Sequence, residues 1–143
     1  MKKPQSLRNA LTNAVIHLRE NPECLHLFVD EGAVVSTLAP SLSWEYRYTL
    51  NVIVTDYAGD PNLLMAPILS WLRDNQPDIM ANPENREKGF TFEVDILNHT
   101  ACDISINLKL TERIQVRADN GHQVVEALPE PVEPDDYWAE RRG

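Results

Sequence analysis

Carboxylates are the side chains of this sequence best suited to chemistry, because a pair of acids can carry out general acid–base catalysis. They occur as a double acid, near a predicted turn and along the polar sides of two predicted strands. Catalysis by such a pair requires a cleft and two environments that separate the pKa values, and the sequence indicates neither. We therefore predict that the protein is not an enzyme. The acids considered are Asp30, Glu31, Asp56, Asp60, Glu93, Asp95 and Asp103.

Metal, nucleophile and cofactor chemistry each require a residue spacing that the chain lacks. No two histidines fall within four residues of one another, and none stands beside a cysteine in a zinc-finger spacing, so no metal site is predicted. Ser41 and Ser43 stand outside the G-x-S-x-G frame of an activated serine. The five glycines are scattered singly, so neither a phosphate-binding loop nor a cofactor is predicted. The histidines are His17, His26, His99 and His122.

Composition and charge limit the partners of the chain. Its 143 residues, 43% hydrophobic and 24% charged, are typical of one soluble globular domain. The net charge of -9 argues against binding nucleic acid through phosphates, since that mode requires a basic patch. No segment approaches the roughly 18 apolar residues of a membrane span, so we expect cytoplasmic synthesis without membrane contact. Cys24 and Cys102 stand far apart, and we predict two free thiols.

The predicted fold is built around the stretch Trp44–Tyr57, WEYRYTLNVIVTDY. Apolar and polar residues alternate along it, with Ile53 as the exception. A period of two is typical of a half-buried strand, and the length suits an interior strand that crosses the whole domain. The apolar row consists of Trp44, Tyr46, Tyr48, Leu50, Val52 and Val54.

Before this strand, the pattern predicts one helix and one hairpin. Apolar residues recur at helical spacing over Ser6–Glu20, and Asn21-Pro22 ends the helix. Leu25–Asp30 is expected to be a strand, with Glu31-Gly32 as a tight turn into a second strand, Ala33–Leu38.

After the central strand, Asp60 is well placed to cap a helix over Asn62–Asn75. Gln76–Gly89 is rich in proline, asparagine and charge, which favours a mobile surface connection. Phe90–Ile96 returns to strict alternation and predicts a strand whose apolar row faces inward. Three more strands are expected over Ile104–Leu110, Ile114–Arg117 and Gln123–Ala127, the last two joined by a type I′ turn at Asp119-Asn120-Gly121.

These elements together predict an α+β fold, with a mostly antiparallel sheet of four to six strands and two main helices packed on one face. We expect a single domain over residues 1–128. Residues 129–143 form an acidic, proline-rich tail with too little apolar surface to become ordered by itself. Tyr137 and Trp138 are its only anchors, so we expect the tail to be disordered unless a partner captures it.

The polar rows of the strands would gather on the sheet face that the helices leave free. A solvated face is common in antiparallel sheets. Mixed charge and short polar side chains also suit a subunit contact or the lining of a channel. The candidate contact residues on this face are Glu45, Arg47, Asn51, Asn107 and Lys109.

Two stretches, SWEYRYTLNVIVTDYAG and LTERIQV, are more specific than any general fold pattern demands. With the sequence around them, over Lys3–Pro131, they resemble the phage tail completion protein R (GpR) family of P2-like contractile-tailed phages and prophages. The resemblance implies a tail-terminator-like, non-enzymatic protein that is made in the host bacterial cytoplasm and joins the virion tail. It would act at the head-proximal end, where it terminates or caps the tube and prepares it for head attachment.

The resemblance also implies partners. These are the tail tube, other tail completion or head-joining proteins, and further copies of the chain in a ring that is often sixfold. It carries over no catalytic residue. Two other classes stay open. One is a host α+β module that binds a ligand or partner in a groove beside Trp44 and Trp71, and the other is a small hydrolase that would use the carboxylates.

Overall fold

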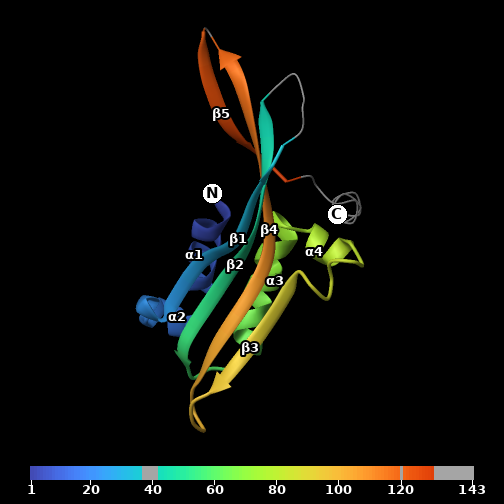
Figure 1. Cartoon of the computed structure of the whole chain (residues 1–143). Coiled ribbons are helices and arrows are strands. Elements are labelled where there is room, and N and C mark those ends of the chain that lie inside the picture. The colour runs from blue at the N-terminus through green and yellow to red at the C-terminus, as the bar shows by residue number, and fades with distance from the viewer. Residues whose placement is uncertain (37–41, 120, 131–143) are drawn as a thin grey trace, which may run out of the picture.

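The computed structural model describes residues 1–36, 42–119 and 121–130, which form a five-stranded antiparallel sheet and several helices (Figure 1). The strand order is β1-β2-β4-β3, and β5 pairs with the far end of β4. This architecture confirms the predicted α+β fold. The elements are α1 (Lys3–Ala14), α2 (Ile16–Glu20), a 3-10 turn (Pro22–Cys24), β1 (Leu25–Val35), β2 (Ser43–Tyr57), α3 (Asn62–Asn75), α4 (Asp78–Ala81), β3 (Phe90–Ile96), β4 (Cys102–Asp119) and β5 (His122–Leu128).

β2 is the central strand, as predicted, and lies between β1 and β4. Its residues Tyr48, Leu50, Val52 and Val54 are buried and alternate with more exposed neighbours. A fully buried aliphatic side chain contributes roughly 1.5–3 kcal/mol to stability, so this row binds the helices firmly to the sheet. The partners of the row in the core are Leu7, Leu11, Leu18, Leu64, Ile68, Leu72, Ile104, Ile106 and Leu108.

The first helical segment differs from the prediction at both its start and its middle. The helix begins at Lys3, with Pro4 in its first turn, and it is interrupted at Val15. Val15 has φ -106° and ψ 116°, an extended conformation that separates α1 from α2. This break turns the Val15 side chain into the core and leaves Ile16 exposed. The prediction of one helix over Ser6–Glu20 was therefore wrong, because the tertiary contact of Val15 outweighs the local helical pattern.

The predicted hairpin at Glu31-Gly32 was also wrong, because β1 is one strand that runs along β2 on both sides of this point. Asp30 lies opposite Thr49 and Ala33 opposite Arg47, so three steps along β1 match two along β2. The extra residue makes a β-bulge, where Glu31 adopts a positive φ of 54°. The Glu31-Gly32 pair, which the sequence indicated as a turn, therefore forms a β-bulge within a continuous strand. Residues 37 and 38 of the predicted second strand lie outside the described residues.

β4 is a single strand, although the sequence predicted a separate segment at Ile114–Arg117. The strand pairs with β2 on one side, and on the other it pairs first with β3 and then with β5. The hairpin between β4 and β5 was predicted correctly: Asp119 lies opposite His122, and Gly121 has φ 82°. Asn120, the middle residue of the predicted turn, lies outside the described residues.

β3 has the predicted bounds, but its apolar row is exposed beyond Phe90, which packs against the core. Phe92 lies opposite Ile106 and Val94 opposite Ile104, which puts the row on the helix-covered side as expected. Phe92 is nevertheless 60% exposed, and Val94 and Ile96 are exposed too. Burial of this row was the wrong part of the prediction, because β3 is an edge strand and an open groove lies between it and α3.

The sheet extends beyond the helices as an arm, which comprises residues 33–36, 42–46, 113–119 and 121–128 (Figure 1). The rest of the described chain is the body. In the arm, Val34, Leu42 and Val125 are exposed, and Val116 is buried. The arm is therefore a sheet with apolar side chains that the helices do not reach.

The connection Gln76–Gly89, predicted to lie on the surface, contains α4 and begins in the core. Gln76 is 1% exposed and Ile79 is buried as well. At the other end of the chain, Pro129 O accepts a hydrogen bond from Arg113, while residues 131–143 lie outside the described residues. The predicted disorder of that tail stays a prediction. The prediction of two free thiols is confirmed, since Cys24 and Cys102 are unpaired.

Candidate contact surface

The register of β2 against β4 brings the five predicted contact residues onto one face of the sheet. Asn51 lies opposite Asn107, and Lys109 is two residues further along β4. Arg47 and Glu45 continue the same side of β2. Because opposite residues of an antiparallel pair share a face, all five lie on the side away from the apolar core row. The sequence predicted this common face correctly, while its use as a contact stays a prediction.

Asn51 and Asn107 form the centre of this face and bond to one another. Asn51 Nδ2 donates to Asn107 Oδ1 at 2.8 Å and to Ser105 Oγ at 3.1 Å. Both amides are half-buried. They therefore stiffen the pairing of β2 with β4, while Arg47 and Lys109 beside them stay exposed.

Glu45, Arg47 and Lys109 supply the charge of the face. Arg47 Nε donates to Glu45 Oε1 at 2.6 Å, and the arginine is exposed. An exposed ion pair of this kind contributes at most about 1 kcal/mol, so a partner can replace it at little cost. Lys109 is exposed and, among the described residues, makes no ion pair. The surface thus offers charges that the fold itself does not require.

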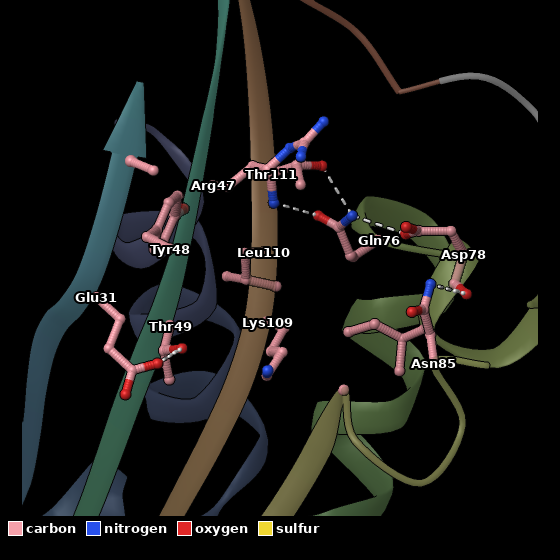
Figure 2. Close-up of a pocket in the computed structure, with 13 residues that line it drawn as sticks. Glu31, Arg47, Tyr48, Thr49, Gln76, Asp78, Asn85, Lys109, Leu110 and Thr111 are labelled. Carbon is pink, nitrogen blue, oxygen red and sulfur yellow. Dashed lines mark hydrogen bonds between the residues drawn. The ribbon is translucent and has the colours of Figure 1, made fainter. Parts of the chain in front are cut away.

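An open hollow of about 330 Å³ lies beside these charges. Figure 2 shows β2 and β4 crossing it, with Glu31 of β1 on one side and Asp78 and Asn85 on the other. The bulge in β1 brings Glu31 here, where its Oε2 accepts a hydrogen bond from Thr49 Oγ1 at 3.4 Å. Carboxylate, ammonium and amide groups at the rim suit a polar segment of another protein.

Gln76 closes a gap in the sheet next to this hollow (Figure 2). β3 pairs with β4 only up to Leu108, and the pairing of β5 with β4 starts at Arg113, so neither strand pairs with residues 109–112. The Gln76 amide takes the place of a strand there. Its Oε1 accepts from Thr111 N at 3.0 Å, and its Nε2 donates to Thr111 Oγ1 at 3.0 Å. A single side chain therefore joins the end of α3 to the edge of β4.

Lys3 ties the start of α1 to the same point. Its Nζ donates to Gln76 Oε1 and Thr111 O, both at 2.6 Å, and to Glu130 Oε1 at 2.7 Å. The lysine is buried, and a buried ammonium is tolerated only when acceptors surround it. The three acceptors therefore account for the position of Lys3, and they bring the chain at Glu130 back against the body.

Glu112 completes this group. It is buried and accepts hydrogen bonds from Tyr48 OH at 2.7 Å and from Lys2 N at 2.8 Å. Burial raises the pKa of Tyr48 far above its ordinary value, and the bond to Glu112 raises the pKa further, so the phenol stays protonated and donates. We call the following residues the polar knot: Lys3, Tyr48, Gln76, Thr111, Glu112 and Glu130.

Sequence reasoning missed the polar knot, although one signal for it was present. The inward row of β4 continues from Leu110 to Glu112, where alternation demands an apolar residue. A carboxylate at an inward position must find donors. Gln76 carried no comparable signal, because a polar residue after a helix is ordinary.

The carboxylates considered for catalysis do not all meet at one site, since Asp30 and Glu31 lie on β1 whereas Glu93, Asp95 and Asp103 lie on β3 and β4. Asp95 lies opposite Asp103, whose Oδ1 accepts from the backbone N of Asp56 at 2.9 Å. Asp60 lies before α3, where its Oδ1 accepts from Asn62 N. In the described part of the chain, no cluster of three or more His, Cys, Asp or Glu residues could hold a metal ion. Within those residues, none of the helices has the length and apolar character needed to cross a membrane.

The two tryptophans considered for a ligand groove have structural contacts. Trp71 is buried and its Nε1 donates to Ser6 Oγ at 3.0 Å, which joins α3 to α1. Trp44 lies in the arm, edge to face with Tyr46, with ring centroids 5.9 Å apart. A binding module with a groove beside both tryptophans has no support in these contacts.

A mostly antiparallel five-stranded sheet with several helices defines an α+β protein. The model of the P2 phage tail completion protein R (GpR) family matches residues 1–131. Tail completion protein R of Escherichia phage P2 is 56% identical over 135 residues, which cover 94% of this chain and 87% of that protein. The chain therefore belongs to the P2 phage tail completion protein R family, as the resemblance implied. No solved structure matches it.

Proposed function

We propose that this protein is a non-enzymatic tail completion protein of a phage or prophage. It acts at the head-proximal end of the tail, terminates or caps the tube and prepares it for head attachment. The observation that carries the proposal is the 56% identity to tail completion protein R of Escherichia phage P2 over 94% of the chain. Assembly takes place in the host bacterial cytoplasm, and the protein remains in the virion tail.

The partners in this proposal are the tail tube, other completion or head-joining proteins, and further copies of the chain. Copies that meet head to tail and close by rotation form a ring, and a sixfold ring would suit a tube end. The sheet supports such contacts, because β1 and β3 are edge strands in the described sheet order.

The contact surface in this proposal is the face that carries Glu45, Arg47 and Lys109. Glu45 and Arg47 can exchange their weak ion pair for contacts with a partner, and Lys109 is exposed. Asn51 and Asn107 act behind them as positioning residues, because their amide pair fixes the spacing of β2 and β4.

The test is to mix the purified protein with tail tubes and to image the tube ends by electron microscopy. We expect specific density at one end of the tubes. The double variant Arg47→Glu/Lys109→Glu should lose most of this density, because it reverses two exposed charges on the proposed surface. The matched control is Arg73→Glu, which reverses an exposed charge on α3.

Absence of end density with the wild-type protein would overturn the proposed function. If the double variant bound tube ends as well as Arg73→Glu does, the function would stand and the contact would belong to another surface. Circular dichroism of each variant checks the fold, and exposed substitutions of this kind change stability by about 0.5 kcal/mol or less.

A further inference from the structure

An apolar groove runs between α3 and the edge strand β3, and it is separate from the polar face. Its volume is about 610 Å³, within the range that accommodates large side chains or small ligands. α3 contributes Met65 and Leu69, and α4 contributes Ile79 and Met80. β3 contributes Phe90, Phe92 and Val94, and Arg86 is the charged residue in the lining.

The groove is exposed along much of its length. Phe92 is 60% exposed, and Leu69 and Val94 are also exposed. β3 pairs with β4 alone among the described strands, so the backbone groups of its outer edge are free as well. A contiguous apolar surface beside an open strand edge is a typical place for another segment to bind.

The described chain ends close to one end of this groove. Glu130 is fixed to Lys3 at 2.7 Å, and it shares a hollow with Pro77 and Asp78. Ile79 and Met80, the next residues along α4, line the groove. The hollow that holds Glu130 and the α3–β3 groove are therefore lined by consecutive residues of one short helical turn.

The segment 131–143, PVEPDDYWAERRG, has the chemistry to occupy this groove. Tyr137 is seven positions beyond Glu130, a span of up to about 24 Å for an extended chain. Tyr137 and Trp138 are its large apolar side chains, and aromatic residues bury about 150–250 Å² each. The acidic pair at 135–136 comes just before them and would enter beside Arg86.

We propose that residues 131–143 bind the α3–β3 groove of the same molecule, with Tyr137 and Trp138 against Phe92 and Leu69, and the preceding acids beside Arg86. Three features of the segment support this choice: the place where the described chain ends, the length of residues 131–143, and the acidic pair that precedes the two aromatic residues. Because the tail has too little apolar surface to fold by itself, the groove supplies the surface that the tail lacks. The match to the family model ends at residue 131, where this segment begins.

The test uses the full chain labelled with 5-fluorotryptophan and observed by fluorine NMR. The chain has three tryptophans, and Trp138→Phe identifies the signal of the tail. We expect the Trp138 signal to be protected from solvent in the wild type, as shown by a small change between H2O and D2O. Phe92→Ser and Arg86→Glu should each abolish this protection.

The matched control is Val125→Ser in the arm, because Val125 has the same 60% exposure as Phe92. It should leave Trp138 protected. The Trp44 and Trp71 signals report the fold of each variant. If Phe92→Ser disturbs these two signals, Arg86→Glu provides the test of the groove instead. A Trp138 signal that is fully solvent-exposed in the wild type would overturn the proposal.

Dilution distinguishes the other occupants of the groove. Protection that does not change with protein concentration supports binding within one molecule. Protection that is lost on dilution would assign the groove to the tail of a second copy and would overturn the intramolecular contact. If the Trp138 signal stayed protected in both Phe92→Ser and Arg86→Glu, the tail would bind another surface, and this result would also overturn the proposal.

Discussion

In the body, β2 and β4 run beneath α1 and α3, whereas in the arm the same two strands continue without a helix over them (Figure 1). Leu50 and Ile106 in the body are fully buried. Val34 and Val125 in the arm, which follow the same alternation, are exposed. Alternation therefore determines which face a side chain occupies, and the neighbouring elements determine whether it is buried.

The polar groups of the two regions differ in the same way. In the body, the polar knot is enclosed, with Gln76 and Lys3 bonded on several sides. In the arm, Arg117 and Glu126 form an exposed pair at 2.7 Å. We infer that the body provides the stability and that the arm and polar face are available to partners.

The largest expected effect comes from a charge in the core of the body. Val52→Asp should unfold the protein, since an unpaired buried charge costs several kcal/mol, comparable with a total stability of about 5–15 kcal/mol. Circular dichroism and thermal melting provide the measurement. The arm counterpart, Val125→Asp, should melt within a few degrees of the wild type. A folded Val52→Asp protein with an unchanged spectrum would contradict the position of β2.

Removal of the Gln76 side chain should have the next largest effect. Gln76→Ala leaves Thr111 N and one donor of Lys3 without an acceptor, and each unsatisfied buried group costs about 1–3 kcal/mol. The two groups together cost about 2–6 kcal/mol, so at about 2–4 °C per kcal/mol the melting temperature should fall by roughly 4–24 °C. The control in the arm is Gln123→Ala, an exposed position that should change little. Equal melting of both variants would show that the polar knot does not stabilise the body.

Tyr48 makes the stability of the body sensitive to alkaline pH. The unfolded phenol loses its proton above the ordinary pKa of 10.0, whereas the folded phenol, with its raised pKa, keeps it. The contribution of Tyr48 to the free energy of unfolding is therefore complete below about pH 10. Above about pH 10, the free energy of unfolding should fall by up to about 1.4 kcal/mol per pH unit. Tyr48→Phe should lose about 1 kcal/mol at pH 8 and show a shallower alkaline decrease.

Urea unfolding at pH 8 and pH 11 measures both effects. The comparison is the pH-dependent loss in the wild type against that in Tyr48→Phe. If the two losses are the same, ionisation of Tyr48 is not coupled to folding.

The smallest expected effect belongs to the arm. Arg117→Ala breaks an ion pair whose side chains are 52% and 42% exposed, so the free energy of unfolding should change by about 0.5 kcal/mol or less. Urea unfolding measures the free energy of unfolding of both variants and can distinguish this small change from the larger one expected for Gln76→Ala. A loss above about 2 kcal/mol would mean that the arm contributes to the stability of the body.

Local sequence patterns predicted the elements whose conformation depends on the spacing of their own residues. The bounds of α3 and β3 and the buried row of β2 follow from spacing and alternation, so they were predictable. The bulge at Glu31 and the break at Val15 were not, because each depends on a partner that is remote in sequence. The candidate contact face was predictable from alternation, whereas the bonds of Gln76 arise only when α3 meets β4.

The most direct test of tail completion is a joining assay with purified heads and with tails assembled without this protein. Joined particles are counted by electron microscopy after the protein is preincubated with the tails or with the heads. Preincubation with tails should allow efficient joining, and tails without the protein should remain unjoined. Equal joining with and without the protein would contradict its role at the head-proximal end of the tail.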